Sequence, residues 1–315
     1  MLMKLYIGRS GTGKTKAILD EIQQQEQINP LGHPQILITP TQETFQLEQQ
    51  LTEEDISGSV RTNVYHFGRL AYRVLSDLGV PLHDSLTDQG MTMLIQSIMT
   101  KHRHELKFFN DHVKYVGFSE QIKESIDEFN KYMVTPDDLF AMIEALDEHD
   151  EYYYYKYHDL ALIYEQVEEA LKDQFLYKED ILKQLAIHIE DSEYIRTSNI
   201  YIDSYHNFTD LEYYIIQLLI QHAQSVTIAL TLDLNDKPLF RKTNETFNRL
   251  QHIGQTLQVD PLVTTFNKVY RHHQQTLNRI QHILDPTDSI EIENDGAIEV
   301  YSASNLSLIH ISEPT

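Results

Sequence analysis

Residues 5–19 read LYIGRSGTGKTKAIL and carry three of the eleven glycines of the chain within six positions. The segment from Gly8 to Thr15 fits the pattern G-x-x-x-x-G-K-[ST] at every fixed position. An apolar run precedes it and a helical pattern follows it, as in a phosphate-binding loop between a strand and a helix. We therefore predict that ATP binds at the eight residues of this loop: Gly8, Arg9, Ser10, Gly11, Thr12, Gly13, Lys14 and Thr15. A plain strand–turn–helix is the alternative.

Each part of this loop has a chemical task. The glycines let backbone N–H groups turn toward a β-phosphate, and the N-terminus of the following helix adds its dipole. Lys14 supplies a positive charge to the β- and γ-phosphates, and the hydroxyl of Thr15 is a ligand for Mg²⁺.

A second acidic site follows the apolar run NIYID, which ends at Asp203. A loop of this kind usually works with an aspartate at the end of another buried strand, so Thr15 and Asp203 are the candidate Mg²⁺ residues. A turn-capping aspartate is the alternative. An active ATPase commonly has a glutamate next, and a motor has glutamine and aspartate three and four residues after the aspartate, whereas this chain has Ser204, His206 and Asn207 at those positions. Serine cannot accept a proton from water near neutral pH, so we predict nucleotide binding without a catalytic residue and with little or no hydrolysis.

Composition limits the classes of function. The chain has 315 residues, 41% of them hydrophobic, and a net charge of −23 from 25 basic and 48 acidic residues. So acidic a surface repels nucleic acid on average, and any DNA contact needs a local patch or a partner. The absence of cysteine excludes disulfides, thiolate metal sites and a cysteine nucleophile within this sequence. Since neither a signal peptide nor an apolar run of membrane-spanning length is present, we expect a cytoplasmic protein without a membrane partner.

The apolar runs change their pattern along the chain. Short, nearly continuous runs predict strands buried on both faces of a parallel sheet. They lie at 3–8, 35–40, 60–67, 199–205, 225–232 and 297–303. Between them, helical spacing dominates, so we predict an α/β P-loop domain with an inserted all-helical subdomain. The expected boundaries are 1–85 for the first part of the α/β domain, 86–195 for the insertion, 196–305 for the return and 306–315 for an atypical tail.

Four longer segments carry a resemblance to a known family. They are ILITPTQETFQLEQQL (36–51), VRTNVYHFGRLAYRVL (60–75), KYVGFSEQIKESIDEFNKY (114–132) and IYIDSYHNFTDLEYYII (200–216). Together with the glycine loop, they resemble the N-terminal region of AddB, the B subunit of the bacterial AddAB ATP-dependent helicase/deoxyribonucleases. The similarity covers about residues 1 to 305, and the last ten residues depart from it.

The resemblance implies a superfamily-1-helicase-like fold without a working motor. It implies a heterodimer with AddA that engages DNA ends and single-stranded DNA, processes double-strand breaks for recombinational repair and recognises Chi. We expect the nuclease domain of the family, with its cysteine-bound iron–sulfur cluster, to lie in a C-terminal part that this sequence does not include.

Two other functions compete with this interpretation. One is an autonomous P-loop ATPase or kinase, which should have a carboxylate where Ser204 stands. The other is a fold relic that binds nothing, against which the complete loop argues.

Several weaker candidates each have a structural alternative. Phe45, Gln46 and Glu48 follow the second strand, where helicases contact single-stranded DNA, but helix packing also explains them. Phe67 and Arg69 allow a phosphate contact or an ordinary ion pair. The tyrosines at 152–155 allow base stacking, although acidic neighbours disfavour it. Capping boxes are predicted at Thr135-Pro136-Asp137-Asp138 and Thr209-Asp210-Leu211-Glu212, and the scattered histidines form no metal-binding pattern.

Overall fold

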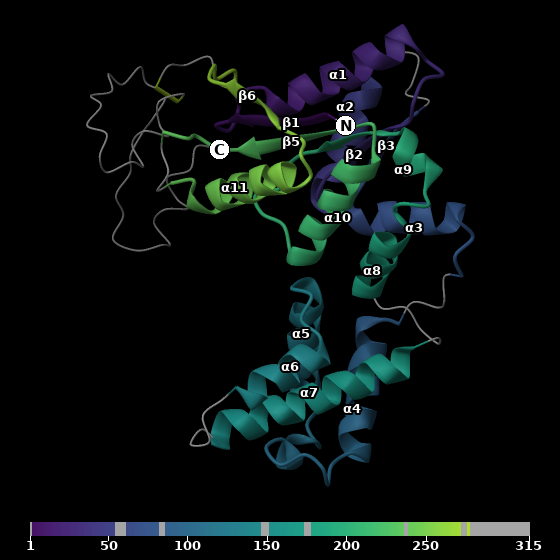
Figure 1. Cartoon of the computed structure of the whole chain (residues 1–315), viewed down its shortest axis with the longest axis vertical. Coiled ribbons are helices and arrows are strands. Elements are labelled where there is room, and N and C mark those ends of the chain that lie inside the picture. The colour runs from purple at the N-terminus through teal and green to yellow at the C-terminus, as the bar shows by residue number, and fades with distance from the viewer. Residues whose placement is uncertain are drawn as a thin grey trace, which may run out of the picture.

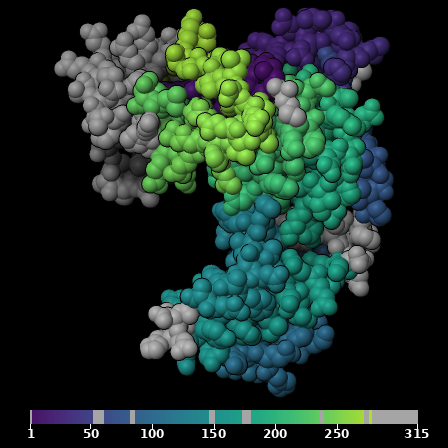
Figure 2. Space-filling model, in the orientation of Figure 1, coloured from purple at the N-terminus to yellow at the C-terminus, as the bar shows by residue number. Residues whose placement is uncertain are grey.

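The computed structural model describes residues 2–53, 61–81, 86–145, 151–172, 178–235, 239–271 and 276–277. These residues form two lobes, one built on a sheet and one entirely helical (Figure 1). The lobes leave a concave side between α11 (Arg241–Thr256) in one lobe and α6 (Pro136–Glu144) and α7 (Glu151–Leu171) in the other, as the space-filling view shows (Figure 2). In the described ranges, no helix combines the length and the apolar character needed to cross a membrane.

The sheet lobe contains six strands in the order β3-β2-β4-β5-β1-β6, and every pairing is parallel. The strands are β1 (Leu2–Gly8), β2 (Gln35–Ile38), β3 (Thr62–Tyr65), β4 (Asn199–Ile202), β5 (Ser225–Thr231) and β6 (Leu262–Phe266). All four residues of β2 are buried, in keeping with a strand covered on both faces. The predicted α/β fold with a parallel sheet is therefore confirmed.

Helices cover both faces of this sheet (Figure 1). They are α1 (Lys14–Ile28), α2 (Thr41–Glu53), α3 (Phe67–Asp77), α8 (Lys178–His188), α9 (Glu193–Thr197), α10 (Asp210–His222) and α11 (Arg241–Thr256). Side chains of α1 and α2 pack with Leu37 and Tyr201 on one face. Those of α3, α8, α10 and α11 pack with Ile36 and Ile200 on the other. The alternation of side chains along β2 and β4 thus supplies two cores from one sheet.

The helical lobe has an apolar core of its own. It comprises α4 (Asp88–Lys101), the 3₁₀ turn η1 (Asn110–His112), α5 (Val116–Lys131), α6 (Pro136–Glu144) and α7 (Glu151–Leu171). Met91, Ile95, Ile126 and Tyr164 are completely or almost completely buried in this core. The capping box predicted at Thr135 is present and starts α6.

Two parts of the predicted organisation need comment. Of the helices in 86–195, α8 and α9 contribute Leu185 and Ile195 to the core of the sheet rather than to that of the helical lobe. Strand β6 was not predicted. Its residues are mostly exposed and it lies at the edge of the sheet, so it lacks the buried apolar run that marks the other strands. The strand predicted at 297–303 and the tail 306–315 lie outside the described residues.

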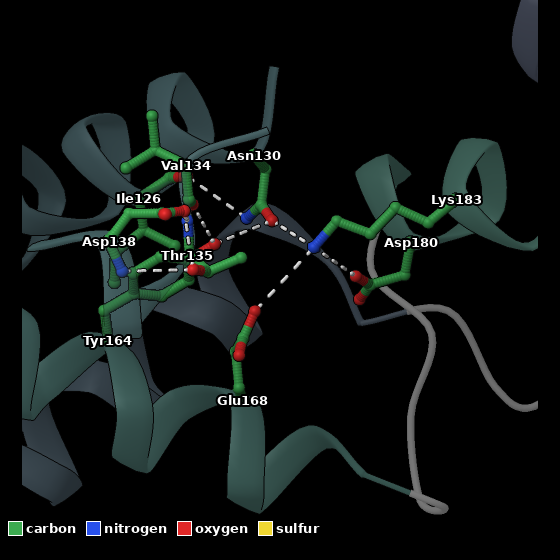
Figure 3. Close-up of polar contacts among 9 residues, drawn as sticks. All are labelled: Ile126, Asn130, Val134, Thr135, Asp138, Tyr164, Glu168, Asp180 and Lys183. Atoms are coloured by element: carbon green, nitrogen blue, oxygen red, sulfur yellow. Dashed lines mark hydrogen bonds and ion pairs between the residues drawn. The ribbon is translucent and has the colours of Figure 1, made fainter. Parts of the chain in front are cut away.

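A polar junction joins the two lobes (Figure 3). Lys183 of α8 donates to Asn130 Oδ1 of α5 at 2.5 Å and lies 3.8 Å from a carboxylate oxygen of Glu168 in α7. The hydroxyl of Tyr164 lies 3.0 Å from the same Asn130 oxygen and 3.1 Å from the carbonyl of Val134. Burial is the main cause that raises the pKa of Tyr164, so its hydroxyl stays protonated as a donor. Hydrogen bonds and charges, rather than a shared apolar core, therefore hold this point of contact.

Candidate nucleotide site

The glycine loop connects the carboxyl end of β1 to the start of α1. Gly11 and Gly13 have φ angles of 74° and 88°, in the left-handed region that residues with a side chain rarely adopt. A Cβ atom at Gly8 would stand 2.4 Å from the carbonyl oxygen of Phe266. The three glycines of the loop thus meet two requirements: Gly11 and Gly13 allow the left-handed backbone conformation, and Gly8 allows close packing against Phe266.

Lys14 is buried at the first turn of α1. Its Nζ donates to the carbonyl oxygens of Gly8 at 2.8 Å and Arg9 at 2.9 Å. Burial lowers the pKa of Lys14 to about 8, and the nearby Asp203 partly opposes this shift. Two carbonyl groups of the loop therefore hold the ammonium group of Lys14 in place.

Asp203 directly follows β4, and its backbone N–H donates to the carbonyl of Ile38 in β2. Its Oδ1 accepts from the backbone N–H of Ser204 at 2.7 Å, and its Oδ2 is buried with no hydrogen-bond partner among the described residues. Burial raises the pKa of this carboxyl, while the neighbouring Thr15 hydroxyl, the Ser204 N–H and the Lys14 charge lower it. The two predicted Mg²⁺ residues, Thr15 and Asp203, are thus close together.

These groups suit Mg²⁺ with a nucleotide. Magnesium keeps several waters and takes one or two protein oxygens beside the phosphates. A hydroxyl and a carboxylate with one unpartnered oxygen are ligands of that kind. The described residues hold no group of three or more histidine, aspartate or glutamate side chains that would bind a metal by themselves.

The position after Asp203 offers no base. Ser204 has a φ of 66°, which turns the chain sharply away from β4. Thr209 and Glu212 form the predicted capping box, which starts α10. The carboxylate of Glu212 is therefore engaged at the start of α10, and the residue directly after Asp203 is a serine.

The segment after β6, which sequence patterns did not assign to this site, lies over the loop. The N–H of Tyr270 donates to the carbonyl of Gly11 at 2.8 Å, and Arg271 Nη1 lies 3.0 Å from Ser10 Oγ. The ring of Tyr270 would be 3.6 Å from a Cβ atom at Gly13. An aromatic ring and a guanidinium therefore lie against a loop shaped for phosphate.

A groove with aromatic and arginine side chains lies along α3. Its volume is about 380 Å³, and Tyr65, Arg69, Tyr72, Arg73 and Ser76 line it. The guanidinium of Arg69 lies 5.5 Å from the centre of the Tyr65 ring, within the range of a cation–π contact. We call these five residues the α3 groove.

The weaker candidates from the sequence, Phe45, Glu48, Phe67 and Arg69, have different environments in the structure. Arg69 makes the ion pair that was one alternative, with Glu48 Oε1 at 3.5 Å, and both side chains are about half exposed. Phe67 is buried against Tyr205 and Phe208, whereas Phe45 is 73% exposed.

The tyrosines at 152–155 contact aromatic rings within the helical lobe. Tyr152 packs edge-on against Phe108, and the ring of Tyr154 stacks on that of His158. These contacts occupy part of the ring surface that stacking on bases would need.

A parallel sheet with an intact glycine loop at the end of β1 and an acidic residue after β4 defines a P-loop-type α/β protein. The family model described as "ADDB, N-terminal" matches residues 5–283. The chain belongs to this family, as its resemblance to AddB proteins predicted.

Curated relatives agree with this assignment. The chain is 38% identical over 309 residues to the B subunit of an ATP-dependent helicase/deoxyribonuclease of Staphylococcus haemolyticus, covering 97% of this chain and 26% of the relative. The corresponding B subunits of Staphylococcus saprophyticus and Staphylococcus aureus strain MRSA252 are each 37% identical, with 97% of this chain and 27% of the relative covered. The chain thus spans about a quarter of the length of these relatives.

Proposed function

We propose that this chain is the N-terminal, nucleotide-binding region of an AddB-type subunit. That subunit pairs with AddA in the cytoplasm, processes DNA double-strand breaks for recombinational repair and recognises Chi. One observation carries the nucleotide assignment: the loop carbonyls hold a buried Lys14 beside Asp203, whose Oδ2 has no hydrogen-bond partner in the part of the chain that the structure describes. The names of the relatives support an ATP-dependent helicase/deoxyribonuclease. The nuclease and the iron–sulfur cluster belong to the C-terminal part of such a subunit.

Each residue of the site has a role toward Mg-ATP. The backbone N–H groups of the loop surround the phosphates, and Lys14 exchanges the carbonyls of Gly8 and Arg9 for phosphate oxygens. Thr15 and Asp203 hold Mg²⁺, which neutralises phosphate charge when it is bound. Arg271 supplies a second positive charge at the mouth of the loop. The direct test is calorimetric binding of Mg-ATP, with Lys14→Ala as the variant that loses the contact.

Hydrolysis by this chain alone is expected to stay near background. Ser204 stands where a general base is expected, and a positioned base contributes about 10² to 10⁴ in rate. Phosphate release should be measured with and without single-stranded DNA, and Lys14→Ala should serve as the blank. A turnover of about 10 per second that disappears in Lys14→Ala would instead favour the autonomous ATPase.

We further propose that the α3 groove contacts single-stranded DNA. Arginine and tyrosine side chains suit a backbone phosphate and an unstacked base, respectively. The Arg69–Glu48 pair is half exposed at 3.5 Å, so exchanging Glu48 for a phosphate costs little. Since the net charge of the chain is −23, we expect tight binding to DNA ends only in the complex with AddA.

The double variant Arg69→Ala/Arg73→Ala is expected to weaken binding of a labelled single-stranded oligonucleotide. Each lost phosphate contact should reduce the magnitude of the negative slope of log affinity against log salt by about 0.7. Fluorescence anisotropy at several salt concentrations gives both quantities. Arg249→Ala is the control, because Arg249, like Arg69, pairs with a carboxylate, that of Asp210, and lies over a tyrosine ring. Equal salt slopes for wild type and the double variant would contradict a DNA-binding role of the groove.

A further inference from the structure

Arg9 is the second residue of the glycine loop, and its side chain reaches out of the loop to the neighbouring strand. Its Nε donates to Asp233 Oδ2 at 2.7 Å, and the two side chains are only 15% and 25% exposed. The guanidinium also lies 5.5 Å from the centre of the Phe240 ring, just before α11. The side chain of Arg9 is therefore engaged with Asp233 and Phe240.

The backbone carbonyl of Arg9, unlike the side chain, makes its hydrogen bonds inside the loop. Its carbonyl oxygen accepts from Thr12 Oγ1 at 2.8 Å and from Lys14 Nζ at 2.9 Å. One residue thus connects the end of β5 to the cation that is expected to contact phosphate.

Asp233 is itself well fixed. It follows β5, which pairs with β1 so that Thr231 lies opposite Gly8, and the N–H of Leu232 donates to the carbonyl of Gly8 at 3.1 Å. Its Oδ1 accepts from the backbone N–H of Asn235 at 2.9 Å. Partial burial raises the pKa of Asp233. The hydrogen bonds from Arg9 and Asn235 and the charge of Arg9 outweigh this effect, so the pKa lies below its ordinary value. The carboxylate is therefore ionised at neutral pH.

We propose that Arg9 and Asp233 are positioning residues of the nucleotide site, a role that rests on the proposed binding of Mg-ATP. When Lys14 leaves the carbonyl of Arg9 for a phosphate, that carbonyl keeps the hydrogen bond from the Thr12 hydroxyl but loses its charged partner. A peptide group that turned its oxygen toward the incoming phosphate would repel it. The Asp233 anchor holds the Arg9 backbone in the orientation that the phosphate needs, so binding does not have to order it.

The test compares two ion pairs whose basic residue lies on β1 or directly after it, Lys4–Glu21 and Arg9–Asp233. Asp233→Asn removes the charge that holds Arg9 without changing the size of the side chain. Glu21→Gln does the same to the Lys4–Glu21 pair, which has the same 2.7 Å separation and side chains that are 20% and 21% exposed. We expect Asp233→Asn to weaken Mg-ATP binding about tenfold and Glu21→Gln to leave it within about twofold, since only the first pair acts on the phosphate loop. Asp233→Glu, which keeps the charge, is expected to recover most of the affinity.

Thermal unfolding without nucleotide separates folding from positioning, because the two charge-removing variants should lose similar stability. If wild type does not bind Mg-ATP, the proposed function itself fails. If wild type binds and Asp233→Asn binds equally well, the positioning role is overturned. The positioning role is also overturned if Glu21→Gln loses as much affinity for Mg-ATP as Asp233→Asn does. In that case the loss of affinity would reflect only the lower stability of both variants.

Discussion

Replacement of Lys14 by alanine is expected to lower the affinity for Mg-ATP at least about tenfold. The variant removes a charged hydrogen-bond donor from a buried site, and such bonds contribute about 1.5–3 kcal/mol. The N–H groups of the loop remain, so residual binding is expected. Isothermal titration calorimetry of wild type and variant measures the difference directly.

The pKa of Lys14 adds a pH dependence to this prediction. Burial lowers that pKa to about 8, so the empty site loses its positive charge as the pH rises through that value. Only the charged form attracts phosphate, and the affinity of wild type should therefore fall as the pH rises above about 8. Lys14→Ala should lack this dependence.

Lys16 provides the control on the same helix. Its side chain is 53% exposed and pairs with Asp20 at 3.0 Å, so Lys16→Ala changes the net charge by the same amount outside the loop. Binding by Lys16→Ala should match wild type. Equal affinities for Lys14→Ala and wild type would show that the loop does not bind the nucleotide.

Replacement of Asp159 by alanine is expected to destabilise the helical lobe by about 3–5 kcal/mol, since it leaves three backbone donors without their acceptor. The carboxylate of Asp159 on α7 is completely buried. It accepts from the backbone N–H groups of Lys107, Phe108 and Phe109 at 3.1, 2.7 and 2.9 Å, respectively. This carboxylate therefore fixes the segment before η1 to α7.

Chemical denaturation monitored by circular dichroism gives the loss of free energy, and limited proteolysis locates it. New cleavage sites should fall between residues 86 and 172, because the helical lobe has its own core. Glu165→Ala is the control on the same helix; this exposed position should change stability by at most about 0.5 kcal/mol. Identical unfolding of Asp159→Ala and Glu165→Ala would contradict the structural role of the carboxylate.

Local patterns in the sequence predicted the central elements of the fold. The glycine loop, the start of α1 and the capping boxes at Thr135 and Thr209 depend on residues a few positions apart. The strand before Asp203 was recognisable because β4 is a short apolar run in the middle of the sheet. The same runs indicated burial on both faces and hence the parallel sheet.

Long-range contacts were not predictable in this way. Arg271 meets Ser10 across 261 positions of the chain, and the edge strand LVTTF that brings it there is mostly exposed, unlike the buried runs of β2 and β5. Arg9 and Asp233 are 224 positions apart, and nothing in either neighbourhood identifies the other. Helical periodicity in α8 predicted an apolar face but not which core it joins, since a 3.6-residue period is the same against a sheet or a helix.

The junction at Lys183 has a mechanical consequence. The hydrogen bond from the charged Lys183 to Asn130 contributes about 1.5–3 kcal/mol, and the partly exposed ion pair with Glu168 adds at most about 1 kcal/mol. Each lobe, by contrast, buries many apolar side chains in its own core, at about 1.5–3 kcal/mol for each leucine or isoleucine. Each lobe is therefore held together more strongly by its own core than the two lobes are held to each other at Lys183. Displacement of the helical lobe is expected to break these polar contacts before it disturbs either core.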